Sequence, residues 1–282
     1  MAITTLDGAL GGMQPPWAFA KTVTPTLVAG RPHSLWYLAG SPGVGLNPSH
    51  TTSGGVALSS TGGWSSNVAG QIPHNNPGSG NAYLGRLNAM AGQAGTLLLC
   101  DRLLHCDYTT TTSGVIVVTT TTAQTLNTTT LPARDNVGST AGAGVLAALE
   151  IEAAVGAGIA TPTISYTGNI NGASQTGSLV DTYVASAAQG AFHRFGLAAG
   201  DTGVASVQSI TLGVSMTSGN IALVLYRVIA ALELVQAFVP NAIDALTSGF
   251  PQIFNGTVPF FVFIPNTTTA CNISGTYLET QG

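Results

Sequence analysis

From about residue 81 onward the chain alternates short apolar runs with turn residues such as Gly, Ser, Thr and Asn. This spacing is typical of an all-β sandwich or barrel. We expect one modest helix at 83–91. We expect strands at 96–106, 115–120, 145–154, 163–167, 191–197, 207–217, 221–235, 258–264 and 272–278.

Two of these segments alternate with a period of two, as strands with one buried face do. Between residues 209 and 217, the apolar positions alternate with Ser, Thr and Gly. In 145–153 the apolar residues share one face, which places Glu150 and Glu152 on the other, solvated or interfacial face. Residues 217–220 read Thr-Ser-Gly-Asn and suit a tight turn, so we predict a hairpin link there.

Residues 1–80 differ in composition, because Gly, Pro, Ser and Asn dominate them. Such a stretch disfavours long helices and regular sheets, yet Trp17, Trp36 and Trp64 need burial. We therefore predict two parts. Residues 1–80 form a loop-rich, extended N-terminal arm, and residues 81–282 form a β-sandwich or jelly-roll-like core domain. A disordered tail is the alternative for the arm.

Charge is scarce: the 282 residues include seven basic and eleven acidic side chains, and Lys21 is the one lysine. An ordinary domain has about a quarter of its residues charged. A surface of Thr, Ser, Asn, Gly and Ala loses little free energy when another subunit dehydrates it. The composition therefore indicates an assembly component. The net charge of −4 argues against direct binding of nucleic acid.

Catalysis needs titratable groups that converge, and here they are scattered. The densest polar segment is 100–107, but on a strand Asp101 and His105 lie on one face and the two cysteines on the other, which does not favour a metal site. Residues 40–45 are Gly-rich but lack the Gly-Lys-Ser/Thr ending of a phosphate-binding loop. We predict no catalytic residue, no cofactor and no metal.

Arg227 and Glu233 lie inside the long apolar run 221–235. A charge there must be paired or face an interface, because an isolated buried charge is costly. We predict a salt bridge between strands or between subunits. The same charged residues make a membrane span unsuitable.

The three cysteines form an odd set, which does not fit a disulfide scaffold, so we expect reduced, partly buried thiols. No secretion signal is evident before Pro15. We therefore expect the protein to be made and used without export through that route.

Several stretches resemble a group of tailed-bacteriophage virion structural proteins, and the match covers roughly residues 80–280. They are Leu-Leu-Leu-Cys-Asp-Arg-Leu at 97–103, the Thr-rich 119–125 leading to Leu131-Pro132, residues 160–167, and 221–227. The resemblance implies a capsid-associated or decoration protein of the head. The chain lacks the long charged helix of the usual tailed-phage major capsid fold, so the role of main shell protein is not expected.

The leading hypothesis is a non-enzymatic virion protein that stabilises the shell through subunit interfaces. Its expected partners are further copies of itself, with a trimer favoured, and the major capsid protein or other virion proteins. A second hypothesis is a tail-fibre module that recognises a host glycan, and a third is a hydrolase that uses Glu150 and Glu152. The expected interface residues are Trp17, Trp36, Trp64, Arg227 and Glu233.

Overall fold

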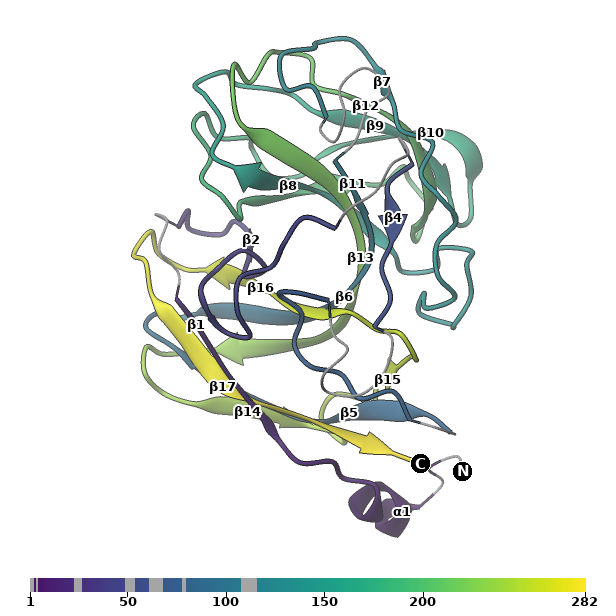
Figure 1. Ribbon diagram of the computed structural model, residues 1–282, viewed down its shortest axis with the longest axis vertical. Helices are drawn as coiled ribbons and strands as arrows, with labels where there is room; N and C mark the ends of the chain where they lie inside the picture. The colour runs from purple at the N-terminus through teal and green to yellow at the C-terminus, as the bar shows by residue number, and fades with distance from the viewer. Residues whose placement is uncertain are drawn as a thin grey trace. The chain divides into compact units, whose positions relative to one another are not determined.

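The computed structural model describes residues 3, 5–22, 27–48, 54–60, 68–77, 80–107 and 116–282. The chain forms two compact units (Figure 1). The first unit comprises Met1–Leu46, Ser59–Asp101 and Val228–Gly282. The second unit comprises Asn47–Leu58 and Arg102–Arg227.

The described residues are almost entirely strand and loop, which confirms the all-β prediction. The elements are α1 (Leu6–Gly11), β1 (Trp17–Thr22), β2 (His33–Ser34), β3 (Gly40–Ser41), β4 (Val56–Ala57), β5 (Ala82–Ala91), β6 (Gly95–Cys106), β7 (Gln124–Thr125), β8 (Leu146–Ala153), β9 (Thr163–Gly168), β10 (Gly172–Leu179), β11 (Phe192–Gly196), β12 (Val204–Thr211), β13 (Asn220–Leu234), β14 (Asn241–Asp244), β15 (Gln252–Ile253), β16 (Pro259–Pro265) and β17 (Asn272–Gln281).

The first unit is a sandwich. One sheet has the order β14-β5-β17-β1-β3, with β15 added to β5, and β2, β16 and β6 lie side by side in the other. In Figure 1 the purple β1 runs beside the yellow β17, and the two pair antiparallel. Apolar side chains of both sheets fill the space between them: the rings of Phe19 on β1 and Phe261 on β16 have centroids 4.4 Å apart.

The second unit is built on the strand order β13-β8-β11-β10-β9-β12-β7, with β4 paired to β6. Residues from β8 and β13 pack in the same core as residues from β9 and β12. This shared core indicates that the sheet is curled. Leu149, Leu223, Tyr166 and Val207 are examples of these fully buried side chains. Every described strand pairing in this unit is antiparallel.

Two strands belong to both units. β6 contributes Gly95–Asp101 to the first unit and the rest of its length to the second, and the 15-residue β13 changes unit after Arg227. Each half of β13 supplies apolar side chains to a different core. The boundary predicted at residue 80 therefore does not coincide with a boundary between units.

Two local predictions are wrong. Residues 83–91 form strand β5, not a helix; its side chains alternate in burial, and β17 pairs along its whole length. Residues 217–220 do turn, with positive φ at Thr217 and Gly219, but they link no hairpin. The strand before them, β12, ends at Thr211 and pairs with β7 and β9, whereas β13 pairs with β8.

The other predicted strands are found within a few residues of their expected limits, apart from 115–120 and 207–217. β12 ends at Thr211, so residues 212–217, most of the alternating segment 209–217, are not strand. Residue 115 lies outside the described residues, and 116–120 form no strand. Of the first 80 residues, the described part contributes β1 to an interior position of the six-stranded sheet. Whether this part acts as an arm in an assembly stays a prediction.

Trp36 is the largest fully buried side chain, and two glycines make room for it. A Cβ on Gly45 would lie 2.4 Å from its indole Nε1, and a Cβ on Gly70 would lie 2.3 Å from the Gly45 Cα. Phe260 meets the indole edge to face at 6.2 Å. The Gly-rich segment 40–45 therefore packs against the buried side chain of Trp36.

We expect Gly45→Ala to lower the free energy of unfolding by about 1–3 kcal/mol, because the added methyl overpacks the indole. Gly43→Ala is the matched control: a Cβ at Gly43 meets nothing within 4 Å. Urea denaturation of both variants measures the difference. Equal stability of the two variants would contradict this packing.

Candidate functional site

Most of the charged side chains lie inside the protein. All 18 are among the described residues, and ten of them are buried. Four are exposed, namely Asp7, Arg86, Glu233 and Asp244. The surface therefore carries few charges, and two clusters of buried polar groups, one in each unit, can be described.

The cluster of the second unit centres on Arg102, which is fully buried on β6. Its two terminal nitrogens bind both carboxylate oxygens of Glu150 on β8, a bidentate ion pair. In the sheet order β13 lies between these strands, and Ala222 is the β13 residue opposite Glu150. Its small side chain leaves room for the pair to meet across the strand.

His105 extends this cluster. Arg102 lies 2.9 Å from its Nδ1, and Glu152 lies 3.0 Å from its Nε2. Asp107 is 4.0 Å from the same Nε2. The expectation that Glu150 and Glu152 face solvent or an interface is therefore wrong: an arginine and a histidine hold them in the interior of the unit.

Within the described part of the chain, His105, Asp107 and Glu152 could by position surround a metal ion, since their ligand atoms lie within 4.8 Å of one another. The tautomer argues against this use. A guanidinium can only donate, so Nδ1 of His105 accepts, and a neutral imidazole then carries its proton on Nε2. A protonated Nε2 directed at Glu152 is not a metal ligand. The geometry fits a chain of polar contacts better than a metal centre.

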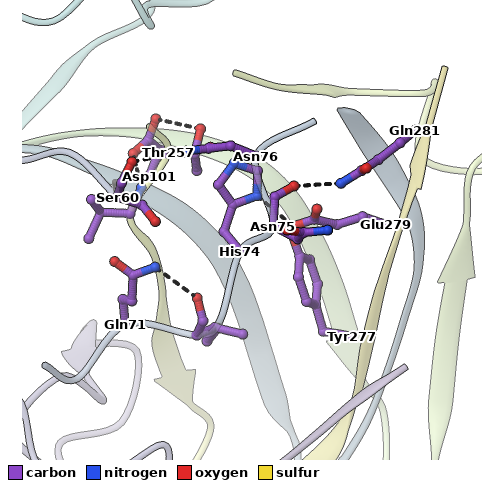
Figure 2. Close-up of polar contacts among 12 residues, drawn as sticks. Ser60, Gln71, His74, Asn75, Asn76, Asp101, Thr257, Tyr277, Glu279 and Gln281 are labelled. Carbon is purple, nitrogen blue, oxygen red and sulfur yellow. Dashed lines mark hydrogen bonds and ion pairs between the residues drawn. The ribbon is translucent and has the colours of Figure 1, made fainter. Parts of the chain in front are cut away.

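The cluster of the first unit centres on Glu279 of β17, and Figure 2 shows its surroundings. The Nδ1 of His74 lies 2.8 Å from Glu279 Oε1, and the hydroxyl of Tyr277 donates to the same oxygen. His74 and Glu279 have no exposed side-chain surface. A substrate could not reach them, so their arrangement is structural.

The same network fixes segment 68–77, which has no regular secondary structure. Asn76 donates to the carbonyl of Ser60 and accepts from the amide of Gly256, and Gln281 donates to the carbonyl of Asn75 (Figure 2). Asp101 accepts from the amide of Val258 at 2.9 Å and so holds the start of β16. In this segment, hydrogen bonds from side chains take the place of the backbone hydrogen bonds that join strands in a sheet.

Lys21 is buried on β1 and donates to the carbonyls of Leu38 and Gly43. Burial lowers its pKa from 10.5 to about 8. Here backbone carbonyls accept hydrogen bonds from a cation. In a phosphate-binding loop, by contrast, backbone N–H groups donate hydrogen bonds to an anion. Burial likewise lowers the pKa of His33 to about 4, so its imidazole is neutral at physiological pH.

The predicted interface residues that the structure describes differ in burial. Trp36 has no exposed surface to offer a partner, Arg227 is buried, and Trp17 is half-buried. Glu233 is exposed and accepts from Thr96 Oγ1 at 2.8 Å. Trp64 lies outside the described residues. The predicted salt bridge of Arg227 or Glu233 stays untested, as does the interface itself.

The structure also describes the cysteines and the apolar run 221–235. The three cysteines are buried and in no disulfide, as expected for reduced thiols. The apolar run 221–235 is strand β13. Among the described residues, no helix has the length and apolar character that crossing a membrane requires.

The sequence matches no protein-family model and no curated protein. Among solved structures it has a weak likeness to the subviral particle of infectious bursal disease virus VP2, with 10% identity over 96% of this chain and 81% of that chain and a TM-score of 0.16. For the structure of the Gt strain of that virus, the identity is 12% over 95% of this chain and 82% of that chain, with a TM-score of 0.17. Such low TM-scores carry no argument about fold or function.

Removing one partner of the buried ion pair tests its role. We expect Arg102→Met to lower the free energy of unfolding by about 3–5 kcal/mol, because Glu150 is left buried and unpaired. The double variant Arg102→Met/Glu150→Leu, which removes both charges, should recover most of the loss. Urea denaturation gives both values. A single variant as stable as the double variant would rule out this pairing.

The lysine predicts a pH dependence. Between pH 8 and 10.5 the unfolded chain holds a proton on Lys21 that the folded chain lacks, so the free energy of unfolding should rise with pH in this window. We expect a rise of about 3 kcal/mol that is missing in Lys21→Met. Denaturation at several pH values measures it. Parallel pH profiles of the two proteins would show that Lys21 titrates normally.

Proposed function

We propose that this protein is a non-enzymatic structural subunit of a virion that works by self-association. The observation that supports this most strongly is the low charge of the surface: four of 18 charged side chains are exposed, and ten are buried. Packing such a surface against another subunit requires few ions to lose their water. Each ordinary interface then contributes apolar burial at about 25 cal/mol per Å², less ordering costs.

The edges of the sheets indicate how copies would meet. The strands that end the two sheet orders, β14, β3, β2 and β7, have between two and four residues. Short edge strands offer few unpaired backbone groups and so discourage strand addition. We therefore propose that contacts form through loops and side-chain surfaces.

The loop after β13 is the best-supported contact surface of the first unit. Val235 and Phe238 are 73% and 74% exposed and lie three residues apart, so this loop presents two apolar side chains to solvent. Phe238 adopts a positive φ of 61°, held by a 2.8 Å hydrogen bond from its amide to the carbonyl of Ala91. Strain at an exposed aromatic residue is typical of functional positions. Glu233, an expected interface residue, lies two residues before this loop.

The finer proposal is a decoration or other capsid-associated protein of a tailed bacteriophage. It rests on the sequence resemblance together with the uncharged surface. Its partners would be further copies of the chain, with a trimer favoured, and the major capsid protein. A receptor-binding module built on the three tryptophans has less support, because Trp36 is a core residue.

A charge placed in the proposed contact tests it. We expect the purified protein to be oligomeric and Phe238→Glu to weaken association at least about tenfold, because the carboxylate would have to be desolvated. Val137→Glu is the control, since Val137 is 73% exposed but lies in the other unit. Analytical ultracentrifugation measures the masses.

Two results would contradict the proposal at different levels. A monomeric wild-type protein at tens of micromolar would contradict self-association itself. An oligomer that Phe238→Glu and Val137→Glu leave equally intact would show that the contact lies elsewhere on the surface.

A further inference from the structure

A pocket of about 280 Å³ lies on the second unit. Its walls are residues 159–163, which lead into β9, and residues 178–183, which follow from the end of β10. Thr163 and Ser178 are directly opposite each other in the antiparallel pair of strands. Side chains that are opposite in this way share one side of the sheet, so two hydroxyls from adjacent strands line the pocket together.

Hydroxyl groups dominate the polar lining. Besides Thr163 and Ser178, the pocket is lined by Thr161 and Thr182. None of these four hydroxyls forms a hydrogen bond with a described residue, and three of the four residues are exposed. Each hydroxyl can both donate and accept. The pocket therefore offers a set of uncommitted groups of mixed hydrogen-bonding capacity.

The pocket carries no net charge. Asp181 lines it, but its two carboxylate oxygens bind the guanidinium of Arg194 at 3.0 and 3.1 Å. This pair is partly exposed and bidentate, which fixes the carboxylate in position. With the charge compensated, the site has no preference for an anion or a cation. A neutral ligand suits it best.

Tyr183 supplies the second observation. It lines the same pocket and is 6% exposed, and its hydroxyl has no hydrogen-bond partner among the described residues. Burial raises its pKa to about 12, so the phenol keeps its proton and remains a donor. An unmade hydrogen bond of a buried group costs about 1–3 kcal/mol. The oxygen is itself buried, so a ligand hydroxyl reaches it only if the Tyr183 ring shifts toward the pocket, and the new bond then removes this cost.

We propose that this pocket binds one ring of a neutral saccharide. The uncommitted hydroxyls and the tyrosine match the alternating donors and acceptors of a sugar, and Ile159 and Leu179 offer apolar surface to its C–H groups. Ligand pockets usually have volumes of roughly 300–1,000 Å³, so this one, at the lower limit, holds about one ring. The inference is independent of the proposed self-association.

The test uses methyl α-D-glucopyranoside, methyl β-D-galactopyranoside and N-acetylglucosamine as probes, with saturation-transfer NMR and titration on the whole protein. We expect at least one probe to bind with a millimolar dissociation constant. Tyr183→Phe and Thr163→Val should each weaken it at least about tenfold, because each removes one hydroxyl at nearly constant shape. Thr176→Val is the control, since Thr176 is exposed on β10 but outside the pocket.

Two results would overturn the proposal. One is the absence of saturation transfer to all three probes. The other is binding that both pocket variants retain at the strength of Thr176→Val, which would place the sugar elsewhere. Ser178→Ala replaces Thr163→Val if the latter loses the dispersed NMR spectrum of a folded chain. Thermal unfolding of Tyr183→Phe adds a further check: loss of an unpartnered hydroxyl should raise its melting temperature, and a lower one would show that the hydroxyl is satisfied in the free protein.

Discussion

The buried pairing of charges is the interaction on which the rest of this structure depends. Arg102 binds both oxygens of Glu150 in the interior of the second unit, and His105 joins this pair to Glu152. Buried ions are costly unless partners compensate for lost water. Because Arg102 and Glu150 are partners within the chain, both can be buried without leaving an unpaired charge in the core. The surface that remains is Thr, Ser, Asn, Gly and Ala with isolated apolar side chains.

In the first unit, too, buried polar side chains hold segments that have no backbone hydrogen bonds of a β-sheet. Glu279 accepts from Tyr277 and contacts His74, and Asn76 connects to Ser60 and Gly256. In a buried network of this kind each hydrogen bond is strong, although Oε2 of Glu279 has no hydrogen-bond partner among the described residues. Most of the few charged residues of this chain therefore hold buried segments together, and few of them contribute charge to the surface. This use fits a protein whose surface is covered in an assembly.

Local patterns predicted the strands well but not their partners. The alternation in 145–153 correctly predicted β8, but it could not show that Glu150 would meet Arg102, because a strand lies between them in the sheet. The 83–91 segment was expected to be helical, and only its long pairing with β17 makes it a strand. The unit boundaries fall inside β6 and β13, where no change of composition marks them. Of the candidate site, the polar residues could be named from the sequence, but their convergence depends on contacts between distant segments.

Cryo-electron microscopy of the intact assembled particle tests the central claim most directly. The account predicts copies of this chain in a symmetric array, with Phe238 and its loop against a neighbouring subunit and the uncharged surface largely covered. Copies that stand isolated in solvent, with that surface exposed, would contradict it.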